Sequence, residues 1–376
     1  MKVFFSAGDV SGDINIAALV AKLRKKYPDV KFGGLGGPQM QKAGFVSDFE
    51  FLKFNKMGYW EVIKNLPFFL SAQKKFIKKM KAEKPDVLVC VDFPGFNKKL
   101  VVEANKLNIR VIWFIAPMIW VWKKESYLKF FEKNKAHIAC ILPFEPKLWL
   151  PRVSTVSFVG NPTLENFDYT TFCPKIPINP KEKFTLALIP GSREQDVKNI
   201  LPFMLECAEV LKALYGKIKI VVSKMPQLPQ NLYENAKNLG FEIETDFNKI
   251  LQEANIALSY TGTVSLQVGL AAIPHIVLYK TSAFNFFVFK MLIKKRILIG
   301  LSNIVAQKEI APIFMQDEMK MTKENVILAA QKIIKIIEEP DEYEKITKEL
   351  CNLRLLLGDK KTSEELLSLI ERSVNL

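Results

Sequence analysis

The feature that most constrains this fold is an alternation of short apolar runs with longer stretches of helical periodicity. In the first half of the chain the apolar runs fall at 2–7, 30–35, 86–91, 110–115, 138–142 and 155–159. Helical patterns separate them near 13–26, 57–64, 68–82 and 96–107. Strands separated by helices pair in parallel, because a tight turn joins only antiparallel neighbours. The first half therefore predicts a doubly wound α/β domain.

The same alternation begins again at Phe184. Apolar runs follow at 184–189, 218–223, 241–245, 255–259 and 274–279. Helical patterns lie near 195–214, 229–238, 263–271 and 284–294, and a mostly helical tail covers 323–374. We expect a second domain of the same class.

The boundary between the domains is marked by three prolines between residues 174 and 180, which resist both helix and strand. We expect an N-terminal domain over 1–163, a linker over 164–183 and a C-terminal domain over 184–355. A last helix over 356–376 can pack back on the N-terminal domain. Two Rossmann-like domains facing a cleft form the GT-B architecture, although dehydrogenases and periplasmic-type binding proteins fit the same pattern.

The charge of the chain points to an anionic partner without identifying it. Its 54 Lys and Arg outnumber 39 Asp and Glu, which gives a net charge of +15. Such a surplus suits nucleic acid, acidic lipid or a phosphorylated substrate, and a general lysine bias also accounts for it.

Cysteine usage and apolar run lengths predict a cytoplasmic protein. The five cysteines are scattered without metal or redox spacing, which favours reduced thiols. No apolar run reaches the ~18 residues of a spanning helix. The N-terminal strand lacks the basic head and cleavage site of a secretory signal.

Three turns that follow predicted strands of the first half are candidate ligand sites. The turn Ser11-Gly12-Asp13 can approach a ligand or cap the next helix. Asp92 follows strand 86–91, where ligands of parallel sheets bind, and is either a general base or a helix cap. Trp120 and Trp122 share a loop that suits an apolar or sugar ligand, or that closes the core.

The second half carries two small-residue turns between strand and helix. Gly191 and Ser192 leave backbone N–H groups free at a helix N-terminus, and Arg193 adds a fixed cation. This combination suits a diphosphate. Thr261-Gly262-Thr263 forms a second such turn, and two of them in one domain favour a nucleotide site.

Residues that would indicate metal or triad chemistry are missing from the sequence. No two Asp residues stand two apart, so there is no D-x-D metal motif. The two histidines, His137 and His275, lie inside apolar strand-like runs, where a core role is the more frequent one. A His-dependent metal site or Ser-His-Asp triad is not expected.

Taken in order, the motifs of this chain resemble lipid-A-disaccharide synthase over roughly residues 1–370. Each is weak alone, but the ordered set is specific. The matching motifs are Ser11-Gly12-Asp13, Met57-Gly58-x-x-Glu61-Val62, Asp92-x-Pro94-x-Phe96-Asn97, Pro117-x-x-Trp120-x-Trp122, Leu142–Glu145, Pro190–Arg193, Thr261-Gly262-Thr263 and Asn303-Ile304-x-Ala306-x-x-Glu309.

The resemblance implies an inverting GT-B glycosyltransferase without a metal or other cofactor. The family moves 2,3-diacylglucosamine from UDP to the 6-hydroxyl of 2,3-diacylglucosamine 1-phosphate (lipid X), giving lipid A disaccharide 1-phosphate. Asp92 matches the general base. The UDP contacts match Gly191, Ser192, Arg193, Thr261, Gly262, Thr263 and Gln267. The acceptor side matches Ser11, Gly12, Asp13, Met57, Glu61, Asn97, Trp120, Trp122, Asn303 and Glu309.

Five positions depart from the family pattern. The family usually has Glu at Asp9, Ser at Ala116, His at Asn161, Pro at Ser302 and Glu at Gln267. The last bears most on activity, because Gln offers one acceptor oxygen to the ribose where a carboxylate offers two. We expect weaker UDP binding or a compensating contact.

Two basic, aromatic stretches are candidates for contact with an anionic inner-membrane surface. In 68–81 the apolar stripe consists of Phe69, Ala72, Phe76, Ile77 and Met80, flanked by lysines. Residues 284–296 repeat the pattern. Such helices suit anionic interfaces, and core packing is the alternative.

Three alternatives stay open. One is another UDP-sugar enzyme of the same architecture, such as an epimerase, and another is an inactive homologue. The third is a basic protein without enzyme activity that binds nucleic acid or membrane. No nucleic-acid partner is expected, since the basic residues follow no RNA-binding module, and a homo-oligomer is compatible with the sequence.

Overall fold

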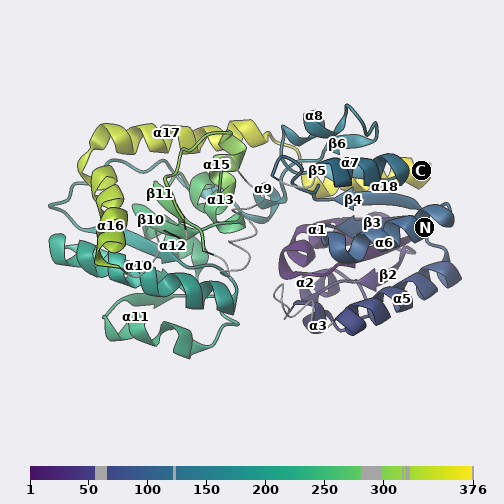
Figure 1. Cartoon of the computed structure of the whole chain (residues 1–376), viewed down its shortest axis with the longest axis horizontal. Helices are drawn as coiled ribbons and strands as arrows, with labels where there is room; N and C mark the ends of the chain where they lie inside the picture. The colour runs from purple at the N-terminus through teal and green to yellow at the C-terminus, as the bar shows by residue number, and fades with distance from the viewer. Residues whose placement is uncertain (56–65, 122–123, 281–297, 316, 318–321, 375–376) are drawn as a thin grey trace. The chain divides into compact units, whose positions relative to one another are not determined.

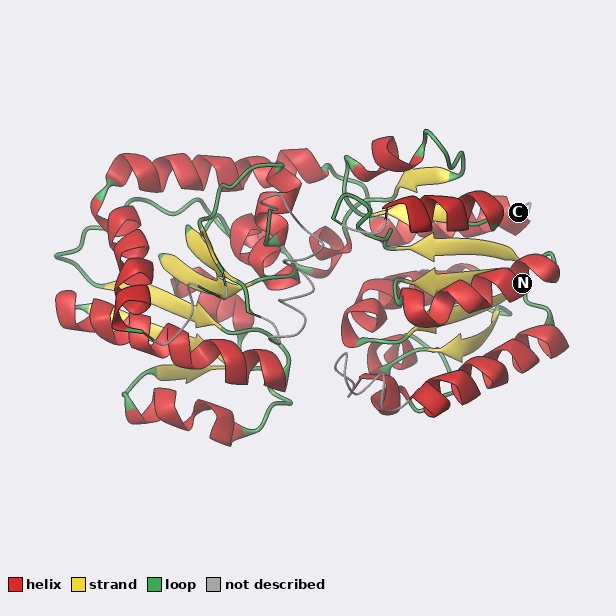
Figure 2. Cartoon of the chain, in the orientation of Figure 1, coloured by secondary structure: helices red, strands yellow, loops and turns green. Residues whose placement is uncertain are grey.

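The computed structural model describes residues 1–55, 66–121, 124–280, 298–315, 317 and 322–374. The chain divides into two compact units, one of residues 1–166 with 358–376 and one of residues 167–357. Each unit contains a six-stranded parallel sheet flanked by helices (Figures 1 and 2).

The sheet of the N-terminal unit has the order β2-β1-β3-β4-β5-β6. Its strands are β1 (Lys2–Ala7), β2 (Lys31–Leu35), β3 (Val87–Val91), β4 (Arg110–Phe114), β5 (His137–Cys140) and β6 (Val156–Phe158). Its helices are α1 (Val10–Lys26), α2 (Pro38–Lys42), α3 (Phe51–Asn55), α5 (Leu66–Glu83), α6 (Pro94–Lys106), α7 (Lys124–Lys133), α8 (Glu145–Trp149), α9 (Pro162–Asn166) and α18 (Thr362–Val374).

Side chains of this sheet are buried on both faces because helices cover both. Val3 and Phe5 of β1 belong to a core cluster with residues of α1 and α18, and Phe4 between them belongs to another with α5, α6 and α7. Alternate residues of a strand point to opposite faces, so a strand covered on both sides is apolar throughout.

The C-terminal helix α18 packs on α1 in the N-terminal unit. Lys22 of α1 pairs with Glu364 at 2.7 Å, and the Tyr27 hydroxyl donates to Glu371 at 2.8 Å. Leu369 of α18 is buried in the core of this unit. The chain thus returns to the first sheet after completing the second.

The sheet of the C-terminal unit has the order β12-β11-β10-β7-β8-β9. Its strands are β7 (Phe184–Ile189), β8 (Ile218–Ser223), β9 (Glu242–Glu244), β10 (Ile256–Tyr260), β11 (His275–Leu278) and β12 (Ile313–Phe314). Its helices are η1 (Tyr169–Thr171), α10 (Glu194–Leu214), η2 (Gln230–Tyr233), α11 (Glu234–Asn238), α12 (Phe247–Glu253), α13 (Thr263–Leu270), α15 (Leu301–Ala306), α16 (Lys323–Glu338) and α17 (Pro340–Leu357).

The doubly wound parallel architecture predicted from the sequence is confirmed, and each predicted strand lies within two residues of an observed one. The pattern missed short elements such as α2, α8 and α15, which contain too few residues to establish a period. The helices expected near 57–64 and 284–294 lie outside the described residues. None of the described helices is long and apolar enough to cross a membrane.

Candidate functional site

Asp92 occupies a strained elbow between β3 and α6. Both Asp92 and Phe93 have left-handed backbones, with φ of 40° and 51°. Ala7 at the end of β1 is in register with Val91 at the end of β3, so Asp9 and Asp92 follow neighbouring strand ends. The N-cap of α6 is Phe93, without a side-chain cap bond, so Asp92 is not the cap of that helix.

The environment of Asp92 suits a group that takes up a proton near neutral pH. Burial raises the pKa of its carboxyl from 3.8 to about 7, the negative charge of Asp9 adds to the rise, and a hydrogen bond from the Phe93 backbone opposes it. Tyr127 of α7 lies close enough for Asp92 to raise the pKa of its hydroxyl, after the larger effect of burial. In the sequence, Tyr127 stands among the apolar residues of α7, and nothing in that pattern indicates its proximity to Asp92.

The Ser11-Gly12-Asp13 turn has mainly a structural role. Asp9 caps α1 by accepting the Gly12 N–H at 2.7 Å. The Asp13 carboxylate is buried and accepts backbone N–H groups of Gly37, Gln39 and Met40 at 2.9, 2.9 and 3.0 Å. It therefore fixes the start of α2 and has no exposed face for an acceptor, whereas Ser11 is exposed.

The other predicted acceptor residues of the N-terminal unit differ in exposure. Trp120 is half-buried and packs edge-on against Phe144 with ring centroids 5.1 Å apart. Asn97 is fully buried, so it is not available to a substrate. Met57, Glu61 and Trp122 lie outside the described residues.

Glu145, in a motif of the sequence analysis, is a second buried carboxyl at this edge of the sheet. Its Oε2 accepts the N–H groups of Ile141 and Leu142 at 3.1 and 2.9 Å. Burial raises the pKa of Glu145 to about 8, although both hydrogen bonds oppose the rise. Because these hydrogen bonds fix the backbone of the turn after β5, we assign Glu145 a structural role.

In the C-terminal unit the two small-residue turns lie side by side. Strands β7 and β10 are neighbours, with Ser259 in register with Ile189. This brings Gly191-Ser192-Arg193 next to Thr261-Gly262-Thr263, at the starts of α10 and α13. Arg193 is the exposed N-cap of α10. Two helix N-termini with an adjacent cation have the chemistry that suits a diphosphate.

Two residues that the sequence did not single out, Tyr260 and Asp196, lie beside Gly191. Gly191 has φ of 107°, and a Cβ there would lie 2.9 Å from the Tyr260 ring and 3.2 Å from Asp196. Burial raises the pKa of Asp196, while Arg193 and a hydrogen bond from Tyr260 oppose the rise. An acidic residue in the first turn of a helix is a recognisable sequence signal.

Asn303 and Glu309, expected on the acceptor side, belong instead to the C-terminal unit. Asn303 is completely buried; its Oδ1 accepts the N–H groups of Ile310 and Ala311, both at 2.8 Å, and its amide donates to two carbonyls. Glu309 accepts the N–H of Ile313 at 3.3 Å. The backbone thus uses the whole amide of Asn303, and the expected contact of this residue with substrate stays a prediction. Gln267 is half-buried on α13.

His275 has the core role expected of it, whereas His137 is half-buried, with its Nε2 2.8 Å from Ser157 Oγ. His275 is fully buried; its Nδ1 lies 2.9 Å from the Ile273 carbonyl and its Nε2 lies 3.2 Å from Ser302 Oγ. Burial lowers its pKa to about 4. Ser302, where the family pattern has Pro, thus has a partner. In the described part of the chain no three His, Cys, Asp or Glu side chains gather into a metal site.

The apolar stripe of 68–81 is buried, which corrects its interpretation as a membrane-facing surface. Phe69, Phe76 and Met80 are part of the core beneath the sheet. The outer row of α5 consists of Leu66, Leu70, Lys74 and Lys78, all exposed. The second stretch, 284–296, lies outside the described residues.

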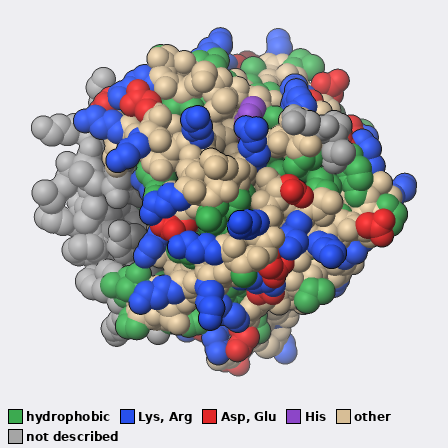
Figure 3. All heavy atoms as spheres, turned by 90° about the vertical axis from the view of Figure 1, so that its right-hand side faces the viewer, with side chains coloured by type: hydrophobic (Ala, Val, Ile, Leu, Met, Phe, Trp, Pro, Cys, Tyr) green, Lys and Arg blue, Asp and Glu red, His purple; other side chains and the backbone are tan. Residues whose placement is uncertain are grey.

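On one face of the molecule the basic side chains are dispersed. Figure 3 shows these Lys and Arg side chains, with fewer Asp and Glu among them. Basic residues occupy the last turns of α1, α5, α6 and α7, where they interact favourably with the helix C-termini. Part of the surplus thus stabilises helices and does not require an anionic partner.

Comparisons with known proteins agree on one family. The profile of lipid-A-disaccharide synthetase matches residues 3–369. Lipid-A-disaccharide synthase of Persephonella marina is 31% identical, over 96% of this chain and 95% of that protein. The enzyme of the same name from Sulfurihydrogenibium sp. is 30% identical, over 98% and 97%.

Solved structures support the fold. The S. aureus MnaA–UDP co-structure aligns with a TM-score of 0.64 at 14% identity, over 100% of this chain and 98% of that one. The calicheamicin glycosyltransferase CalG4 aligns with a TM-score of 0.60 at 13% identity, over 100% and 98%.

Proposed function

Since the chain belongs to the lipid-A-disaccharide synthase family of UDP-sugar glycosyltransferases, we propose that it transfers 2,3-diacylglucosamine from UDP to the 6-hydroxyl of 2,3-diacylglucosamine 1-phosphate. The products are lipid A disaccharide 1-phosphate and UDP. The observation that carries the proposal is the half-buried Asp92 at a strand end, where burial raises the pKa of its carboxyl to about 7.

The donor site of the proposal is the pair of helix N-termini in the C-terminal unit. Free N–H groups at the starts of α10 and α13 and the Arg193 guanidinium offer positive charge to the diphosphate. This charge gains most when the bond to the sugar breaks and negative charge develops on UDP. In the proposal, Arg193 and the two helix N-termini supply the positive charge that the leaving UDP needs.

The acceptor step of the proposal uses Asp92 as the base. An alcohol is a weak nucleophile at neutral pH, so its proton must leave as it attacks. The Asp92 carboxylate accepts the proton of the 6-hydroxyl, whose oxygen bonds to the anomeric carbon. The bond from that carbon to the phosphate oxygen breaks, and UDP leaves with the electron pair. A single displacement of this kind inverts the anomeric carbon.

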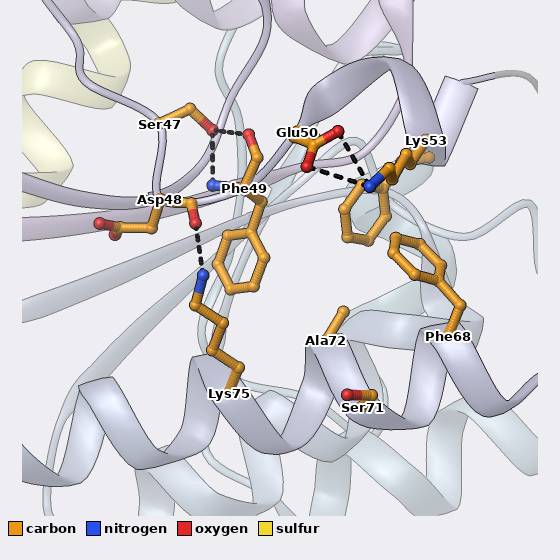
Figure 4. Close-up of a pocket in the computed structure, with 10 residues that line it drawn as sticks. Ser47, Asp48, Phe49, Glu50, Lys53, Phe68, Ser71, Ala72 and Lys75 are labelled. Carbon is orange, nitrogen blue, oxygen red and sulfur yellow. Dashed lines mark hydrogen bonds and ion pairs between the residues drawn. The ribbon is translucent and has the colours of Figure 1, made fainter.

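Peripheral contact with an anionic membrane is part of the proposal, because both substrates carry acyl chains. The outer row of α5 passes from Leu66 and Leu70 to Lys74 and Lys78, which gives an apolar end and a basic end. Beside α5 and α3 lies a pocket of about 420 Å³, lined by three phenylalanines together with polar and charged side chains such as Glu50 and Lys75. In Figure 4 Phe68 of α5 borders it opposite the segment that carries Phe49 and Lys53. In the proposal, the exposed Leu66 and Leu70 face the apolar part of the lipid, and the lysines of the same helix face its anionic headgroups.

The test is a product assay with purified protein, UDP-2,3-diacylglucosamine and 2,3-diacylglucosamine 1-phosphate in mixed micelles. The expected result is equal molar release of UDP and disaccharide 1-phosphate, with inversion at the anomeric carbon. Omitting the acceptor is the control and should abolish UDP release. An epimerised UDP-sugar without disaccharide, or no reaction while RNA binds in a salt-sensitive way, would contradict the proposal.

A further inference from the structure

The elbow that presents Asp92 is held in a conformation that its residues disfavour. Asp92 and Phe93 are consecutive non-glycine residues with φ of 40° and 51°. Such backbones persist only where surrounding contacts hold them. Without those contacts the segment would relax and the carboxylate would move.

One contact that holds the elbow comes from Asn97, in the first turn of α6. Its Nδ2 donates to the Asp92 carbonyl at 2.7 Å, and its Oδ1 accepts the Ser6 hydroxyl of β1 at 2.6 Å. Ser6 and Asn97 are both fully buried. The pair therefore ties the Asp92 backbone to the neighbouring strand without contacting solvent.

Packing around Phe93 fits the same arrangement. The Phe93 ring stacks on Phe96 with centroids 5.5 Å apart. A Cβ on Gly8 would lie 2.6 Å from that ring, so the Phe93 side chain occupies space that only glycine leaves free. The elbow is thus packed on one side and hydrogen-bonded on the other.

We infer that Ser6 and Asn97 are positioning residues for catalysis, because they fix the left-handed Asp92 backbone and thereby aim its carboxylate at the acceptor hydroxyl. The inference rests on the proposed role of Asp92 as base. It replaces a direct contact of Asn97 with substrate, since Asn97 is buried and its amide is used inside the protein.

A merely structural role would predict a different outcome, and α6 offers a matched control. Asn105, near the other end of the same helix, donates to the carbonyls of Val101 and Lys135 at 2.9 and 3.0 Å and accepts the Lys135 N–H at 2.8 Å. Asn105→Ala removes side-chain to backbone hydrogen bonds far from Asp92 in the helix. Both variants lose stability, and only Asn97→Ala should disturb the base.

The test compares kcat, acceptor KM, UDP affinity and thermal midpoint for Asn97→Ala, Ser6→Ala and Asn105→Ala in the transfer assay. A displacement of about 1 Å at a reacting group costs on the order of 10²-fold. We expect Asn97→Ala to lower kcat by about that factor, Ser6→Ala by less, and Asn105→Ala not at all. UDP affinity should stay unchanged in all three.

Equal kcat in parent, Ser6→Ala and folded Asn97→Ala would overturn the inference. If Asn97→Ala does not fold, Ser6→Ala carries the test by itself, and an unchanged kcat there overturns it. Asp92→Asn separates the two claims. If that variant keeps full kcat the proposed base is wrong, whereas if it loses kcat while Ser6 and Asn97 variants keep it, only the positioning role fails.

Discussion

Replacing Asp92 with Asn should stabilise the fold, and more so at high pH. The folded pKa of Asp92 is raised from 3.8 to about 7. A carboxyl with a raised folded pKa favours the folded state below its unfolded pKa, and that advantage is lost as pH rises through the folded pKa. The parent protein therefore loses stability between about pH 4 and pH 7 because of this group.

The size of the effect follows from the same pKa rise. At about 1.4 kcal/mol for each pKa unit, the ionised carboxylate costs about 4 kcal/mol above pH 7. Asn carries no charge at any pH, so Asp92→Asn should gain about 2 kcal/mol near pH 5 and about 4 kcal/mol near pH 8.5. Glu145, whose pKa is also raised, is present in both proteins and cancels from the difference.

The assay is urea denaturation of parent and variant at both pH values. Asp29→Asn, on the exposed turn after α1, is the matched control, and its effect should stay within about 0.5 kcal/mol at both. A stability difference for Asp92→Asn that does not grow by about 2 kcal/mol between the two pH values would refute the reasoning. Asp92 would then be solvated in the folded protein.

Further predictions concern the donor site and the surface of α5. Arg193→Ala should lower kcat/KM for the UDP-sugar by the equivalent of about 2–4 kcal/mol, because a charge-assisted contact is lost. An unchanged kcat/KM would show that the diphosphate does not bind beside Arg193. Lys74→Gln with Lys78→Gln should weaken sedimentation with anionic vesicles by about 1 kcal/mol per lysine. The comparison variant replaces Lys75 and Lys79 with Gln, because both lysines already have partners within the protein. Equal loss of vesicle binding in the two double variants would refute a role of the outer row. Transfer should continue in EDTA, since Arg193 and the helix N-termini supply the positive charge, and loss restored by magnesium would contradict this.

The strands could be predicted from the sequence because their burial on both faces leaves continuous apolar runs. The run Val87–Val91, for example, is buried throughout. The stripe on α5 was misjudged for a related reason. A core-facing amphipathic helix and a membrane-facing one have the same pattern, and only the partner surface distinguishes them. Here the sheet covers Phe69 and Phe76, and the exposed apolar residues are Leu66 and Leu70.

The sequence identified candidate site residues where they directly follow a predicted strand. Asp92 and Arg193 both stand one to four residues after a buried strand, where parallel sheets bind ligands. Asn97 and Asn303 could not be interpreted from the sequence, because a motif does not reveal whether an amide faces substrate or backbone. Tyr127 is close to Asp92 only through the packing of α7, which involves residues distant in the chain.

The measurement that tests the central claim most directly is kcat of Asp92→Asn in the transfer assay, together with its affinity for UDP. Asn keeps the size of the side chain and can hydrogen-bond, but its amide cannot accept the proton. We expect a kcat loss of about 10²–10⁴-fold with UDP affinity unchanged, because the proposed diphosphate site belongs to the other unit. A variant that keeps kcat but loses UDP binding or stability would contradict the claim that Asp92 is the base.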